Sequence, residues 1–368
     1  MKKTKIISLI CVFAMLVGCF ASFSAVAATT EKNYTYNDRG GVEGMTYLID
    51  NTNFLDFWEG TKHQTVVGTY KLTEDIVLNT GDASKWSDSA NRVANQNGFR
   101  KSWNTPIGGV GSFKGTFDGQ GHSISGICLV AADQGHYAGL FGKVDGGTVK
   151  NVSLINSYIE AVTASNGSLP SGSIVALLNN GTVENCYSEA IMNNLGTAVG
   201  DPNSATVGGI VGRAIGTSNI KNCVFAGKII ATVGPTGGIL GSNNAGYSST
   251  LGANDGGKVT VSDCLNLGAI YSNSYNAPIV GRAYKYQNRE IGVTIKDCMN
   301  LSKDMGSTQW QDGELIGVGD GCFTVENYIL VEGFRIPNVK YIGNAGNGTN
   351  LDIKRRSILF AICAIPLV

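Results

Sequence analysis

The sequence predicts an all-β fold: a parallel β-helix, or solenoid, of about six coils with a short helical cap at its N-terminal end. Three observations lead to this prediction. A glycine-rich unit recurs along the chain, as in solenoids and arrays. The copies hold short apolar runs between turn residues, which favours strands over helices. Glycine makes up 50 of the 368 residues and hydrophobic residues 43%, which suits many short strands around a core.

The copies align on a short apolar strand with valine or isoleucine at its centre. These residues are Val149, Val183, Ile220, Val261, Ile295 and Val325, at intervals of 34, 37, 41, 34 and 30 residues. A second, glycine-rich strand precedes five of the six copies, as in GGIVG at 208–212. Strands stacked about 4.8 Å apart would place each valine or isoleucine on its own copy above and below. A single coil buries too little apolar surface to offset its ordering, so several coils must stack.

Two further columns accompany the valine column. One holds Asn151, Asn185, Asn222, Asp263, Asp297 and Asn327. We expect it at a bend, where these side chains satisfy turn backbone groups and hydrogen-bond along the stack. The other holds Cys186, Cys223, Cys264 and Cys298. These cysteines are interpreted as buried, reduced thiols, with disulfides between adjacent copies as the alternative.

The chain begins with a transport signal, predicted over residues 1–27, in which a basic start precedes an apolar run. Ala25-Val26-Ala27 is an A-x-A cleavage site, whereas Leu16 to Cys19 resembles a lipobox whose Cys19 would carry a lipid anchor. Both alternatives export the protein, so we expect it to be secreted or held at the cell surface. No membrane span is expected after signal removal, because the apolar stretch that closes the sequence is too short to cross a bilayer.

Three segments follow the signal. Residues 28–112 are predicted to form the N-terminal cap and first strands. They include an amphipathic helix over 48–58 that would cover the end of the stack, with Leu48, Phe54, Leu55 and Trp58 on one side. Residues 113–332 are the β-helix repeats. Residues 333–368 form a C-terminal tail, and either the chain is truncated there or the tail packs on the last coil.

The repeats resemble those of bacterial surface proteins that carry the GLUG motif. The matching residues are Gly139-Leu140-Phe141-Gly142, Gly209-Ile210-Val211-Gly212 and Gly238-Ile239-Leu240-Gly241. The copy at 172–178 lacks the closing glycine, and Pro278 replaces the first glycine of the last copy. The resemblance covers about residues 45–332. It implies a right-handed β-helix of the pectate-lyase-like kind, an exported location, and an adhesion or glycan-related role.

The residues give little support to catalysis. Carbohydrate-cleaving β-helices need paired carboxylates or acidic Ca²⁺ ligands with a basic residue. Glu160, Glu184 and Glu189 do not recur in columns. The most site-like cluster, Asp118 to His122, is interpreted as a tight glycine turn in which Asp118 bonds its own backbone, with Asp133 and His136 as nearby loop residues. No catalytic residue, metal site or cofactor is predicted.

The sequence therefore predicts an exported, non-catalytic surface protein, adhesin-like or glycan-binding. The alternative is a polysaccharide lyase or glycoside hydrolase on the same scaffold. Glycans or host and cell-surface proteins are the expected partners; the even balance of 28 basic and 28 acidic residues gives no reason to expect nucleic acid. Binding is expected first at the inserted loops 161–171, 192–206, 242–258 and 283–292.

Two groups of side chains are candidate ligand contacts. The cations that follow the glycine-rich strands, Lys143, Arg213 and Arg282, alternate with Asn179 and Ser242 and could meet an acidic glycan. The tyrosines Tyr271, Tyr275, Tyr284 and Tyr286 could stack on sugars or proteins. The alternatives are solvated turn residues and buried tyrosines. Trp86 and Trp103 are interpreted as packing residues of the cap or first coil.

Overall fold

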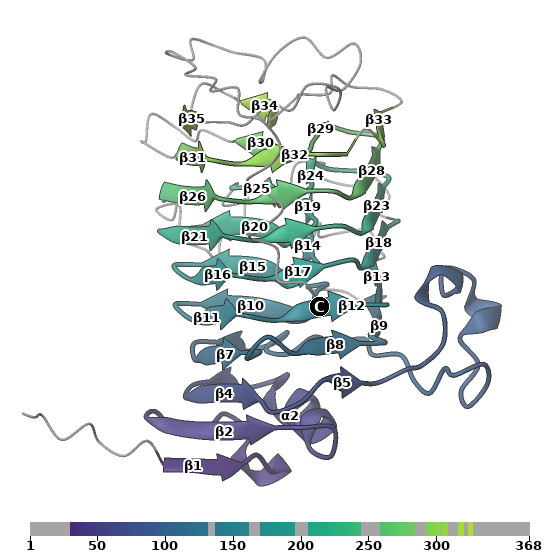
Figure 1. Ribbon diagram of the computed structural model, residues 1–368, viewed down its shortest axis with the longest axis vertical. Coiled ribbons are helices and arrows are strands. Elements are labelled where there is room, and N and C mark those ends of the chain that lie inside the picture. The colour runs from purple at the N-terminus through teal and green to yellow at the C-terminus, as the bar shows by residue number, and fades with distance from the viewer. Residues whose placement is uncertain are drawn as a thin grey trace, which may run out of the picture.

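The computed structural model describes residues 30–131, 137–161, 170–195, 205–243, 258–283, 292–302, 304–307, 316–319 and 323–326. In Figure 1 the strands of successive coils lie one above another along the long axis of the molecule. The predicted signal and C-terminal tail, and most of the inserted loops, lie outside these residues. Within them, no helix is both long and apolar enough to cross a membrane.

The coils form parallel sheets. The ten-stranded sheet contains β1 (Thr30–Asn33), β2 (Met45–Ile49), β4 (Thr69–Leu72), β7 (Thr116–Asp118), β11 (Thr148–Lys150), β16 (Thr182–Glu184), β21 (Ser218–Lys221), β26 (Lys258–Ser262), β31 (Gly292–Lys296) and β35 (Phe323–Glu326). The eight-stranded sheet contains β3 (Thr65–Val66), β6 (Ser112–Phe113), β10 (Phe141–Asp145), β15 (Val175–Asn179), β20 (Val211–Ile215), β25 (Leu240–Ser242), β30 (Val280–Ala283) and β34 (Ile316–Gly319).

Three smaller sheets complete the coils. The seven-stranded sheet contains β5 (Ile76–Val77), β8 (Ser123–Ser125), β12 (Ser153–Ile155), β17 (Tyr187–Ser188), β22 (Val224–Phe225), β27 (Leu265–Asn266) and β32 (Met299–Asn300). The six-stranded sheet contains β9 (Cys128–Ala131), β13 (Tyr158–Ala161), β18 (Ile191–Asn194), β23 (Lys228–Ala231), β28 (Ala269–Ser272) and β33 (Met305–Ser307). The four-stranded sheet contains β14 (Ser171–Gly172), β19 (Val207–Gly208), β24 (Thr236–Gly237) and β29 (Asn276–Ala277).

The predicted valine column exists. Val149 pairs with Val183, Ile220 with Val261, and each of the six residues faces the next copy in a neighbouring parallel strand of the ten-stranded sheet. The first five side chains are completely buried. The fold is therefore the predicted right-handed parallel β-helix, since parallel crossovers of this kind are right-handed in about 98% of cases.

The stack is longer than the six coils that the repeat indicated. The same buried column continues upstream through Phe117, Tyr70 and Tyr47. These residues are aromatic, so the first coils do not resemble the valine-containing copies in sequence. The segment 28–112, predicted as the N-terminal cap and first strands, thus contributes further coils to the stack.

The helix is displaced from its predicted position. Residues 45–49, Leu48 among them, form β2, and a turn at Asp50 separates this strand from α2 (Phe54–Thr61). The turn ends the strand because the Asp50 carboxylate accepts hydrogen bonds from the Thr52 backbone amide and hydroxyl. Phe54 and Trp58 of the helix are completely buried, as predicted, and join the core at the N-terminal end of the stack.

Residues 79–103 leave the stack as one long connection, here called the excursion, which extends sideways in Figure 1. It contains the short 3-10 helices η2 (Ala83–Lys85) and η3 (Ser89–Asn91); a third, η1 (Tyr36–Asp38), lies near the N-terminus. Trp86 and Phe99 pack with Cys128 and Tyr158 on the outer face of the six-stranded sheet. The excursion thus packs against the outer face of the β-helix through these side chains.

Candidate functional site

The asparagine column forms the bend between the ten-stranded and seven-stranded sheets. Asn151, Asn185 and Asn222 have φ values of 54, 53 and 54°, and Asp263 and Asp297 have 54 and 49°. This left-handed conformation favours Asn and Asp over most other residues. Asn185 Nδ2 donates to Asn151 Oδ1, and Asn222 Nδ2 to Asn185 Oδ1, each over 3.0 Å. Asn327 lies outside the described residues. The column serves the fold rather than a ligand.

The cysteine column lies inside the stack. Cys186, Cys223, Cys264 and Cys298 are free and buried, as is Cys128 in the packing beneath the excursion. Each thiol of the column contacts the carbonyl oxygen two residues before it, at 3.1–3.3 Å. Burial raises the pKa of Cys186 and Cys264 well above the ordinary value, and that of Cys128 to about 12. Cys128, Cys186 and Cys264 are therefore weakly nucleophilic packing groups.

A cleft of about 430 Å³ lies at the N-terminal end of the six-stranded sheet. Its lining consists of Glu59, Lys62, Lys101, Ser102, Trp103, Asn104, Thr105 and Val130. These residues come from the last turn of α2 and the residue after it, from the end of the excursion and the two residues that follow it, and from β9. The cleft therefore exists only because the helix and the excursion interrupt the regular coils.

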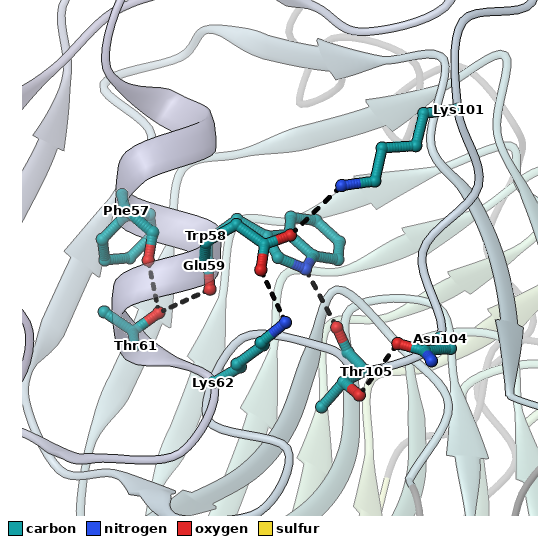
Figure 2. A network of polar contacts seen from close by, with 8 residues as sticks. All are labelled: Phe57, Trp58, Glu59, Thr61, Lys62, Lys101, Asn104 and Thr105. Atoms are coloured by element: carbon teal, nitrogen blue, oxygen red, sulfur yellow. Dashed lines mark hydrogen bonds and ion pairs between the residues drawn. The ribbon is translucent and has the colours of Figure 1, made fainter. Parts of the chain in front are cut away.

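Hydrogen bonds and ring contacts fix the floor of the cleft. Trp58 Nε1 donates to the Thr105 carbonyl oxygen over 2.9 Å, which ties α2 to the chain just after the excursion (Figure 2). The rings of Trp58 and Trp103 lie 5.5 Å apart. Trp103 also pairs with Leu129 of β9 as an isolated parallel bridge. Trp103 thus extends the wall of the β-helix by one further position.

The charges of the cleft converge on one carboxylate. Glu59 lies between two ammonium groups, with Lys62 Nζ 2.5 Å from Oε2 and Lys101 Nζ 3.4 Å from Oε1 (Figure 2). Burial opposes ionisation of Glu59, but the hydrogen bond and charge of Lys62, assisted by Lys101, hold the pKa of Glu59 below its ordinary value of 4.5. The side chain of Lys101 is 59% exposed. At neutral pH the cleft holds two positive charges and one negative charge.

Two uncharged groups complete the lining. The Asn104 side-chain oxygen accepts a hydrogen bond from the Thr105 hydroxyl over 3.2 Å, and Asn104 is exposed. Trp103 is almost fully buried, and its indole N–H has no hydrogen-bond partner among the described residues. A buried donor without an acceptor costs about 1–3 kcal/mol. The cleft therefore combines an apolar wall with several donors, a composition found in sites for polar organic ligands.

The predicted cation column differs in its register. Lys143 faces Leu177, which faces Arg213, so Leu177 occupies the position expected for Asn179. Arg213 in turn faces Ser242, which faces Arg282. Alternate coils do carry the cations, but Arg213 is only 6% exposed. A buried guanidinium is a poor surface contact for a polymer.

The predicted tyrosines lie in different settings. Tyr271 is 37% exposed on the outer face of the six-stranded sheet, with Lys228 Nζ 5.3 Å from its ring centroid and its hydroxyl donating to Asp304. Tyr275 lies under the guanidinium of Arg282, 5.8 Å from its ring centroid. Tyr284 and Tyr286 lie outside the described residues. Neither Tyr271 nor Tyr275 lines the cleft.

The Asp118 cluster is a turn. Asp118 accepts hydrogen bonds from the Gln120 backbone amide and from Asn151 Nδ2, so it also begins the asparagine column. Gln120 and Gly121 have positive φ values of 54° and 86°. Asp133 and His136 lie outside the described residues, among which no group of three or more His, Cys, Asp or Glu side chains could hold a metal ion.

The carboxylates singled out in the sequence are engaged elsewhere. Glu184 pairs with Lys221 over 3.0 Å on the outer face of the ten-stranded sheet. Glu160 accepts from Arg92 and from the Tyr158 hydroxyl, and Glu189 accepts from the Asn156 backbone amide. None of the three lines the cleft. The charged residues that do are Glu59 and Lys62 at the end of α2 and Lys101, which lies 42 residues after Glu59.

The comparisons with known proteins agree with this architecture. Residues 203–230 match the family model of the GLUG motif, as predicted, and no curated protein matches the chain. The chain resembles a protein of known structure from Bacteroides ovatus, described as a "putative immunoglobulin A1 protease". The two share 19% identity and a TM-score of 0.50, over 86% of this chain and 83% of the other. At this identity the likeness establishes the fold alone.

Proposed function

We propose that this GLUG-motif β-helix is an exported, non-catalytic surface protein that binds glycans, and that the cleft at Trp103 is its primary contact site. The observation on which this proposal depends is the composition of the cleft. The lining of one cleft of about 430 Å³ combines an aliphatic side chain, an amide, three charged groups and an indole that is only 5% exposed. Apolar surface that packs on a sugar ring, next to polar groups that bond its hydroxyls, is the usual chemistry of saccharide recognition.

The charges of the cleft favour binding over hydrolysis. A glycosidase of the common kind needs two carboxyl groups, of which one is a protonated general acid. Glu59 is the carboxylate in the lining, and Lys62 and Lys101 lower its pKa. A group held ionised in this way is a poor proton donor at neutral pH. This arrangement supports a binding protein more than the alternative of a lyase or hydrolase.

The scaffold supports a surface role. The Asn and Cys columns and the buried valine column use their side chains for packing and turns, which leaves long, regular outer faces. Tyr271 on the six-stranded sheet offers a second exposed contact, with Lys228 and Asp304 beside it. A glycan that leaves the cleft along this sheet, or a cell-surface protein that carries such glycans, is the kind of partner that this layout suits.

The test is retention of labelled glycans by the purified protein, with an assay for new reducing ends on the same samples. We expect selective retention without release of sugars. Lys101→Ala should reduce retention, because it removes an exposed donor from the cleft. Lys221→Ala removes an equal charge from the ten-stranded sheet and serves as the control. Release of reducing ends, or equal retention by all three proteins, would contradict the proposal.

A further inference from the structure

We infer that the cleft selects sugars that bear a carboxylate, such as uronic acid residues of acidic polysaccharides, and that Glu59 is an internal anion which the sugar carboxylate displaces. This inference rests on the proposed function and names the ligand class of the same site. It follows from the way in which the two lysines share one carboxylate.

The two ion pairs of Glu59 are unequal. Lys62 follows α2 directly and contacts Glu59 at 2.5 Å, whereas Lys101 belongs to the excursion and lies 3.4 Å away. The Lys62 side chain is 24% exposed and that of Lys101 59%. A long, exposed ion pair is weak because water screens it. The free-energy cost of exchanging Glu59 for a ligand carboxylate at Lys101 is therefore small.

The charge count favours an anion. Two ammonium groups face one carboxylate, so a positive charge remains in the cleft when Glu59 is ionised. A ligand carboxylate would accept hydrogen bonds from Lys101 and from Lys62 as Glu59 turns away. Charge-assisted hydrogen bonds of this kind are about twice as strong as neutral ones. A neutral sugar would gain none of this energy and would leave the Glu59 pairs in place.

The remaining lining suits a sugar ring rather than an isolated anion. Val130, which is half-buried, provides apolar surface and Asn104 is exposed, whereas Trp103 lines the cleft but is only 5% exposed. A pyranose carboxylate directed at the lysines would place its ring on this surface and a hydroxyl near the amide of Asn104. Small anions such as sulfate would contact only the lysines and should bind much more weakly.

The proposed exchange of Glu59 for a sugar carboxylate at Lys62 and Lys101 is tested by calorimetric titration of the full exported chain. The ligands are octasaccharides of galacturonate, glucuronate and mannuronate, each with its carboxyl-reduced neutral counterpart. We expect at least one acidic oligosaccharide to bind about tenfold more tightly than its reduced form. Lys101→Gln should lower that affinity about tenfold, since it removes one charge-assisted hydrogen bond.

The decisive variant is Glu59→Gln. It removes the competing anion and should raise the affinity for the acidic octasaccharide about fivefold, with little change for the neutral one. Glu184→Gln makes the same chemical change in an ion pair outside the cleft and should leave both affinities unchanged. Circular dichroism and melting curves confirm that each variant is folded.

The outcomes separate the two proposals. If acidic and reduced octasaccharides bind equally and both respond to Lys101→Gln, the charge selection is wrong while glycan binding at the cleft stands. If Glu59→Gln weakens acidic binding, Glu59 contacts the sugar directly and is not a displaced anion. If no oligosaccharide binds, or binding ignores every cleft variant, both proposals fail. Equal binding of inorganic sulfate and the acidic octasaccharides would also overturn the inference.

Discussion

The buried column of the ten-stranded sheet has aromatic side chains at its N-terminal end and aliphatic side chains in the later coils. In the first coils the ten-stranded sheet fills its inward position with Tyr47, Tyr70 and Phe117, whereas from Val149 onward the same position holds only Val or Ile. The aromatic part also receives Phe57 of α2, whose ring lies 4.9 Å from Tyr70 and 6.0 Å from Phe117. The Cys and Asn columns accompany the aliphatic part, whose core also includes Phe141 and Phe225 from other sheets.

This difference indicates that the coils which give the molecule its length are not the coils that carry the proposed site. The aliphatic coils repeat because each must fit its own copy, which restricts the inward side chain of this column to a similar small volume. The aromatic end has no such restriction, because a helix and a long connection enter there once. The cleft belongs to this irregular end. The regular coils extend the molecule, and the irregular coils carry the site.

The largest expected effect comes from the helix. Phe57→Ala should lower the free energy of unfolding by about 3–5 kcal/mol, because a fully buried aromatic ring leaves a cavity. Ile220→Val in the aliphatic coils is the matched control, and about 1 kcal/mol is expected. Urea titrations measure both. Hydrogen exchange should show Phe57→Ala loosening residues 45–72 first; equal loosening along the whole stack would mean that the two ends are not distinct.

The next effect concerns the excursion. Arg92 Nη2 lies 3.1 Å from Glu160 Oε2, and both side chains are largely buried. Glu160→Gln should weaken this contact by about 2 kcal/mol, because it removes the charge that pairs with Arg92. Faster hydrogen exchange over 82–100 is expected, together with weaker sugar binding, since the excursion carries Lys101 into the cleft. Unchanged exchange in that segment would show that the ion pair does not hold it.

A smaller effect is expected in the asparagine column. Asn185→Ala loses two amide hydrogen bonds and places alanine at a φ of 53°, for which about 1–2 kcal/mol is expected. Asn185→Gly keeps the backbone freedom and should be milder. Thermal melts of both variants test this order. A glycine variant as unstable as the alanine variant would assign the whole effect to the side-chain bonds.

The smallest effect is the pH dependence of Glu59. Its pKa is lowered in the folded protein, so its contribution to stability is complete above the ordinary value of 4.5 and is lost as the pH falls through the lowered pKa. The stability difference between the wild type and Glu59→Gln should therefore shrink below pH 4.5. Urea titrations between pH 3 and pH 7 measure it. A difference that grows on acidification would reverse the assigned sign.

Strict repetition made part of this molecule predictable. Val183, Asn185 and Cys186 recur at matching positions in neighbouring copies, so their columns follow from the sequence alone. The strands predicted within 28–112 could not be aligned with the repeat, because Tyr47 and Tyr70 differ in size from valine. The helix begins later than predicted because Leu48 belongs to the strand β2, and the turn at Asp50 separates this strand from the helix. The cleft could not be predicted, since Glu59 and Lys101 are 42 residues apart and meet only through tertiary packing.

The most direct test of the central claim, that the irregular end carries the site, is a crystal structure of the protein with an acidic octasaccharide. We expect a sugar carboxylate between Lys62 and Lys101, its ring on Val130, and the Glu59 side chain turned away. An octasaccharide seated on the regular coils, for instance at Tyr271, with the cleft unchanged, would contradict it.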